Sequence, residues 1–184
     1  MDYKIFKAIN RLAGHFPPLD ALMIFISNKI RYVYMGVLVF TWFKNKKMTV
    51  NVLISVLVGI LINTIIKAFC FKPRPYMKHR VGILLPSKND STVLSKHTLL
   101  VFAVSTSILF RDRFLGTIMT AFSIITGFSR IWLGLHYPSD VIKSAFTGSI
   151  ISMLVERIQR FKNTWCHDPK SSDLQDLQSE RYFD

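Results

Sequence analysis

The residue types best suited to chemistry in this chain of 184 residues lie in a segment that begins Ser129-Arg130 and continues to His136 and Asp140. Pro138 favours the first turn of a helix, so Asp140 is expected in that turn, close to His136. There its carboxylate can hold one imidazole nitrogen and leave the other as a nucleophile or base. Because an arginine and an aspartate near membrane depth are costly unless paired or functional, the pattern indicates a reactive site.

A second candidate cluster is Ser95-Lys96-His97, directly before an apolar run over residues 98–110. The N-terminus of a helix offers free backbone N–H groups and the positive end of the helix dipole, which together favour an anion. Taken alone, the segment fits equally well a serine that only caps the helix and a surface histidine. A hydroxyl, an ammonium and an imidazole in succession nevertheless suit a phosphate and its leaving group.

The third cluster consists of Lys67, at the end of an uncharged run, and Arg74, which stands between Pro73 and Pro75. The prolines favour an extended backbone that fixes the direction of the arginine. Alone, the two cations fit side chains that reach toward lipid headgroups. With the other clusters they suggest phosphoryl chemistry, in which Lys67, Arg74 and Arg130 neutralise phosphate oxygens. One histidine would attack and the other would protonate the departing oxygen.

This set of residues predicts a reaction without a metal or any other cofactor. Metal-dependent phosphatases use several carboxylates or histidines as ligands, whereas these clusters contain Asp140 as their one carboxylate. Cys70 and Cys166 form no CxxC pair and lie far apart in the sequence, so neither a disulfide framework nor a zinc site is indicated.

The composition predicts that these clusters are positioned by membrane helices. Half of the residues are hydrophobic, 13% are aromatic and the formal net charge is +13, which argues against disordered and ordinary cytosolic classes. A nucleic-acid binder is excluded because long apolar runs separate the basic residues. We therefore predict an all-α, polytopic membrane bundle with about five to six membrane helices.

The clearest expected span covers residues 48–66, and further spans are expected over 97–110, 114–133 and 138–155. Residues 19–43 are interrupted by Asn28, Lys29 and Arg31, so they fit either one tilted span or two shorter helices. Residues 1–13 alternate apolar and basic positions at helical spacing, which predicts an amphipathic helix in the membrane interface. No cleavable signal sequence is expected.

The short basic connections predict the orientation, because lysine and arginine are retained on the cytoplasmic side. Residues 44–47, 111–113 and 157–162 fall on one side if the spans alternate, and the three clusters fall on the external side. Charge complementarity to phosphate explains why Lys67, Arg74 and Lys96 lie where positive charge should be scarce. The expected organisation is a membrane-embedded domain over 1–160 and a flexible, cytoplasmic tail over 161–184, with five acids after residue 164.

The three clusters resemble the motifs of the type 2 phosphatidic acid phosphatase superfamily, K-x6-R-P, P-S-G-H and S-R-x5-H-x3-D. The first and third are matched in full. In the second, Leu94 stands where the family has proline and Lys96 where it has glycine, while Ser95 and His97 are present. The short chain and the stretch G-F-S-R-I-W-L-G-L-H-Y-P-S-D are similar to the bacterial undecaprenyl-diphosphate phosphatases that confer bacitracin resistance. The similarity covers roughly residues 3–157.

The resemblance implies a multi-pass phosphatase of the bacterial plasma membrane whose active site faces the outside. It implies that His136 is the nucleophile and forms a phosphohistidine, that Asp140 orients it, and that His97 protonates the leaving group. The same carry-over gives phosphate binding to Lys67, Arg74, Ser95, Ser129 and Arg130. Lys96 either strengthens anion binding or lowers the pKa of the neighbouring imidazole.

Three alternatives to a polyprenyl-diphosphate phosphatase are considered. The substrate is a polyprenyl diphosphate or another phospholipid, so a phosphatidylglycerophosphate or phosphatidate phosphatase is the runner-up. The altered second motif also fits a catalytically impaired member that binds lipid phosphates. A channel or transporter is disfavoured because the sequence lacks the inverted repeats of many carriers. The oligomeric state is left open.

Overall fold

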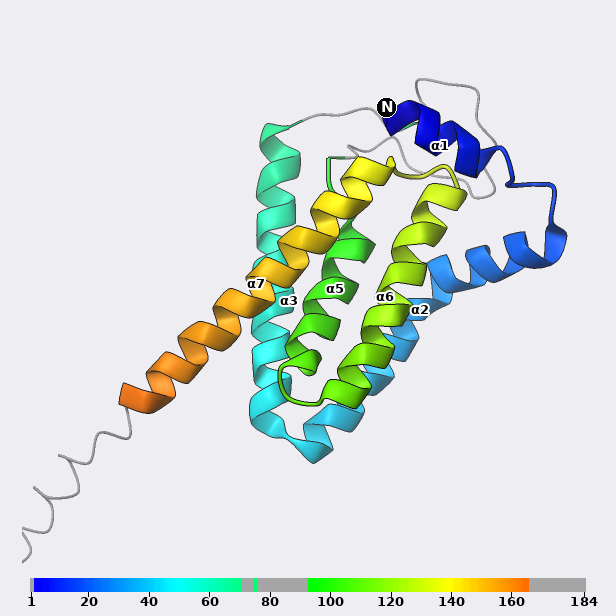
Figure 1. The fold of residues 1–184 in the computed structure, drawn as a ribbon. Coiled ribbons are helices and arrows are strands. Elements are labelled where there is room, and N and C mark those ends of the chain that lie inside the picture. The colour runs from blue at the N-terminus through cyan, green and yellow to red at the C-terminus, as the bar shows by residue number, and fades with distance from the viewer. Residues whose placement is uncertain (1, 71–74, 76–92, 166–184) are drawn as a thin grey trace, which may run out of the picture.

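The computed structural model describes residues 2–70, 75 and 93–165. Within those residues the chain is all-α, as predicted, and Figure 1 shows its helices gathered into one bundle. The helices are α1 (Asp2–Asn10), α2 (Pro17–Lys44), α3 (Lys46–Phe69), α5 (Lys96–Leu109), α6 (Arg113–Trp132) and α7 (Pro138–Trp165). The expected tail over 161–184 lies mostly outside the described residues.

Three of these helices, α2, α3 and α6, are long and apolar enough to cross a membrane. The open question over residues 19–43 is answered by α2, which is one helix from Pro17 to Lys44 and contains Asn28, Lys29 and Arg31 without a break. Helix α5 is a shorter apolar helix, as expected for residues 97–110. Helix α7 begins at Pro138, as expected, and extends past the expected end at 155 to Trp165.

Helix α5 forms the centre of the bundle and packs against α3, α6 and α7 (Figure 1). Its contact with α7 is close because Gly148 has no side chain: a Cβ there would lie 2.3 Å from the carbonyl oxygen of Leu99. Small residues allow such backbone approach between membrane helices. Hydroxyl groups add bonds between helices, as where Ser152 Oγ donates to the carbonyl oxygen of Ala103 at 2.5 Å.

The α2–α3 and α5–α6 turns lie together at one end of the bundle. Asn45 caps α3 by accepting a hydrogen bond from Met48 N at 3.1 Å, and Asp112 caps α6 by accepting from Leu115 N at 3.0 Å. Lys44 Nζ joins the two turns, 2.8 Å from Asp112 Oδ2. The hydrogen bond from Lys44, with that of the Leu115 N–H, lowers the pKa of the Asp112 carboxyl.

The end that holds these turns is called the basic end here. It also holds the final turns of α7, because Arg111 after α5 pairs with Glu156 of α7. Its cations are Lys44, Lys46, Lys47, Arg111, Arg113, Arg157, Arg160 and Lys162. The predicted clustering of the basic connections on one side is therefore present in the fold.

Candidate active site

The opposite end, called the motif end, brings together the start of α5, the end of α6 and the start of α7. Gly127 of α6 marks the meeting point, since a Cβ there would lie 2.9 Å from Val141 and 3.5 Å from the methyl carbon of Thr98. Thr98 follows His97 in the sequence, and Val141 follows Asp140. The second and third motifs, separated in sequence, thus share one end of the bundle.

The third motif is carried by a tight turn between α6 and α7. Gly134 has a φ of +74°, a left-handed conformation that glycine adopts without steric cost. The turn folds back on α6, so that the backbone N–H groups of Leu135 and His136 donate to the carbonyl oxygen of Arg130 at 3.1 and 3.3 Å. His136 is 3% exposed and Asp140 is 1% exposed. Both are held inside the protein, and their mutual contact stays a prediction.

Arg130 is buried at the end of α6, and its partner comes from another helix. Its Nη1 donates to Ser27 Oγ of α2 at 2.5 Å. Ser27 was not expected at the site. The sequence around it indicates no such role, because it shows only a small polar residue inside an apolar run. Ser129, the neighbour of the arginine, is fully buried and donates its hydroxyl to the carbonyl oxygen of Thr126 at 2.7 Å. Arg130 is therefore anchored to α2 at its guanidinium end.

Ser95 of the second motif is the N-cap of α5. It is fully buried, and its Oγ accepts hydrogen bonds from the N–H and the hydroxyl of Thr98 at 3.4 and 2.9 Å. Its own N–H donates at 2.7 Å to the hydroxyl of Ser144, which in turn donates to the carbonyl oxygen of Asp140 at 2.6 Å. The start of α5 is thereby fixed on the first turns of α7. Leu94, at the position where the resemblance expects proline, is buried.

His97 lies half-buried one residue beyond the exposed Lys96. It lines an apolar groove of about 170 Å³ between α2, α3 and α5. The lining residues include Arg31 and Tyr34 of α2 and Val56 of α3. Arg31, first seen only as an interruption of a span, thus lines the same groove as a motif histidine. A charged residue inside an apolar run was the signal for it.

The first motif is described only in part. Lys67 is half-buried near the end of α3, and Pro75 is buried. Arg74 lies outside the described residues, so its predicted phosphate contact stays a prediction. Among the described residues, no three histidine, cysteine, aspartate or glutamate side chains gather into a group that could hold a metal ion.

Sequence reasoning missed the residues that hold the α6–α7 turn from outside. Trp132 is 3% exposed, and its Nε1 donates to Asp20 Oδ1 of α2 at 2.7 Å. Asp20 also accepts from Gly14 N at 3.0 Å, and Asn10 of α1 donates to the carbonyl oxygen of Trp132 at 3.0 Å. Asp20 could have been suspected of such a role, because it is an acid at the start of an apolar run.

Helix α1 adds a second contact to the same turn. Asp2 accepts hydrogen bonds from the backbone N–H of Ser139 at 3.0 Å and from its hydroxyl at 2.5 Å, and so caps the start of α7. The ring of Phe6 lies 5.5 Å from that of Tyr137, between centroids, and burial raises the pKa of the Tyr137 phenol. The predicted amphipathic helix is present over Asp2–Asn10, and it holds the turn that carries His136.

Replacing Asp20 with alanine is expected to loosen this turn. The buried indole N–H of Trp132 would lose its acceptor, at a cost of about 1–3 kcal/mol, and the exposed Gly14 N–H would turn to water. We expect a lower melting temperature in detergent together with slower phosphate release. Asn28→Ala, on the exposed side of the same helix, is the matched control. An Asp20→Ala protein as stable as that control would contradict the assigned role.

The helical fold and the spacing of the motifs together define a class of membrane phosphatases. The chain belongs to the PAP2 superfamily, whose family model matches residues 48–164. The resemblance that the motifs suggested is thus confirmed.

Among individual proteins, the chain is 40% identical to undecaprenyl-diphosphatase BcrC of Bacillus subtilis (strain 168), over 85% of this chain and 83% of that relative. Its fold is similar to that of Aquifex aeolicus LpxE, with a TM-score of 0.76 and 22% identity over 85% of this chain and 94% of that one. It is also similar to a transmembrane PAP2-type phosphatidylglycerolphosphate phosphatase from Bacillus subtilis, with a TM-score of 0.68 and 18% identity over 86% of each chain. The chain is thus a membrane protein of this fold.

Proposed function

We propose that this protein is an undecaprenyl-diphosphatase that releases phosphate from undecaprenyl diphosphate and returns undecaprenyl phosphate to peptidoglycan synthesis, which confers bacitracin resistance. The observation that supports a lipid as the substrate is the apolar groove between α2, α3 and α5, whose lining includes His97. A long isoprenoid chain can lie along apolar helix surfaces while its diphosphate meets the buried polar residues of the motif end. The particular lipid is proposed from the name of the 40% identical relative.

In the proposed reaction, a nitrogen of His136 attacks the terminal phosphorus while the bond from that phosphorus to the bridging oxygen breaks. The phosphoryl group is then bound to His136, and undecaprenyl phosphate leaves with the proton that His97 supplies. Water next attacks the phosphorus and gives a proton back to His97, the bond from phosphorus to His136 breaks, and inorganic phosphate is released. Asp140 orients the nucleophile. The phosphate oxygens would be bound by Lys67, Arg74, Ser95, Lys96, Ser129 and Arg130.

The proposed membrane topology counts α5 and α7 with the three candidate spans, which gives five membrane helices among the residues that the structure describes, with α1 in the interface. The basic end would face the cytoplasm, because positively charged connections are retained there. The motif end would then open to the outer face of the bacterial plasma membrane. The gathering of the basic connections at one end of the bundle supports this orientation.

The test is phosphate release by the purified protein in detergent, measured on undecaprenyl diphosphate, phosphatidylglycerophosphate and phosphatidate with and without chelator. We expect the highest rate on undecaprenyl diphosphate and no loss with chelator. A higher rate on either other lipid would support the runner-up substrate. Binding without turnover, recovered by Leu94→Pro with Lys96→Gly, would instead indicate the catalytically impaired member.

A further inference from the structure

The basic end contains a cavity that the proposed reaction does not use. Its volume is about 240 Å³, and it lies between the start of α3, the turn after α5 and the final turns of α7. The lining residues are Lys46, Lys47, Val50, Asn51, Arg111 and Gln159. Three of them are cations, two are amides and none is an acid, which is the chemistry of a site for an anion.

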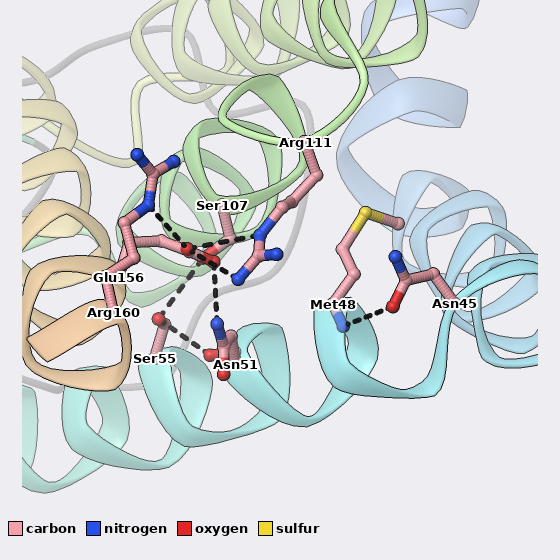
Figure 2. A network of polar contacts seen from close by, with 8 residues as sticks. All are labelled: Asn45, Met48, Asn51, Ser55, Ser107, Arg111, Glu156 and Arg160. Atoms are coloured by element: carbon pink, nitrogen blue, oxygen red, sulfur yellow. Dashed lines mark hydrogen bonds and ion pairs between the residues drawn. The ribbon is translucent and has the colours of Figure 1, made fainter. Parts of the chain in front are cut away.

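The guanidinium of Arg111 is fixed in this wall by a buried acid, as Figure 2 shows. Glu156 is 2% exposed, and its Oε2 accepts hydrogen bonds from Arg111 Nε and Nη2 at 3.3 and 3.2 Å. Its other oxygen accepts from Asn51 Nδ2 at 2.9 Å, and Arg160 Nε lies 4.0 Å from Oε2. A buried carboxylate needs such partners to offset its desolvation. The charge of Glu156 is thus compensated without help from the lysines of the cavity.

Lys46 and Lys47 supply the positive charge that is left uncompensated. Both are exposed, and in the described part of the chain neither forms an ion pair, whereas nearby Lys44 pairs with Asp112 at 2.8 Å. The backbone N–H groups of the first turn of α3 add the positive end of a helix dipole at the same place. A cavity with this lining attracts negative charge, and Glu156, which is bonded to Arg111 and Asn51, is already engaged.

The surroundings of the cavity favour a lipid over a small soluble anion. Val50 lines the cavity and is 43% exposed, and Trp42 and Phe43, directly before the α2–α3 turn, are also exposed. The volume is below the roughly 300 Å³ of a pocket for a whole drug-sized ligand, so it suits a headgroup whose apolar part stays outside. Basic pockets at the ends of membrane helices bind such headgroups. We propose that this cavity binds the phosphate of an anionic phospholipid from the membrane leaflet at the basic end.

The test titrates the purified full chain, in a neutral detergent, with phosphatidylglycerol, phosphatidylcholine or inorganic phosphate, and follows the melting temperature and the lipid retained in native mass spectrometry. We expect phosphatidylglycerol to raise the melting temperature more than either other addition. Lys46→Gln with Lys47→Gln should weaken this binding about 30-fold, since each basic residue near anionic lipid contributes about 1 kcal/mol. The single variants replace the pair if the pair fails to fold.

The matched control is Arg157→Gln with Lys162→Gln, which removes the same charge from the basic end at exposed positions outside the cavity. All three proteins keep the motif end intact, so binding there cancels in the comparison. Equal losses in both double variants would overturn the proposal, because they would reflect surface potential alone. A full shift with inorganic phosphate, or none with phosphatidylglycerol, would overturn it as well. None of these results depends on turnover, so failure of the proposed function would be seen separately.

Discussion

Replacing His136 with alanine is expected to reduce the rate of phosphate release from undecaprenyl diphosphate by at least about 10³-fold. Loss of a proton-transfer group alone costs a factor of this size, and loss of a nucleophile costs more. The structure gives the reason for a specific effect. His136 is buried, and its backbone N–H is bonded to the end of α6, so the imidazole starts from a fixed backbone position. The measurement is the initial rate in detergent at saturating substrate.

His15→Ala is the matched control, since His15 is an exposed histidine in the turn between α1 and α2. It should keep the full rate. A second measurement follows the phosphohistidine intermediate with substrate that is radiolabelled in its terminal phosphate. After rapid quenching without acid, the label should be bound to the wild-type protein and should be missing from His136→Ala. A variant that retained the rate, or a label that persisted after the substitution, would remove His136 from its proposed role.

The sequence predicted the helices well because their signal is local. Long uncharged runs identified α3 and α6, and Pro138 identified the first residue of α7. The start of α5 was predictable because Ser95 is a good cap before an apolar run, and the structure confirms that cap. The clustering of basic connections at one end followed from the alternation of the spans.

What could not be predicted depends on pairs that are distant in sequence. Trp132 and Asp20 carry no pattern in the sequence that links them, yet the indole N–H donates to the carboxylate. Glu156 directly follows the span expected over 138–155, yet it is buried against Asn51 and Arg111. Periodicity describes a single helix, whereas these bonds arise from how helices pack. The third motif was found because its residues are adjacent in the chain, and the contacts that fix its turn were missed because they are not.

Arg130→Lys is the second substitution with a large expected effect. Lysine keeps the positive charge but lacks the planar set of donors that can bind Ser27 and phosphate oxygens at the same time. Arg130 donates to Ser27 Oγ at 2.5 Å while 8% exposed. We expect the rate to fall by about 10² to 10³, the range for loss of one donor to a charge that develops in the transition state.

The effect should fall mainly on the rate at saturating substrate, because the lysine still attracts the diphosphate. Ser27→Ala should lower the same rate by a smaller factor, since it frees the guanidinium without removing it, and Arg113→Lys, exposed at the basic end, should leave the rate unchanged. A melting temperature close to wild type would separate lost chemistry from lost folding. If Arg130→Lys kept the full rate, phosphate binding would have to rest on the other cations, and the bond to Ser27 would be structural alone.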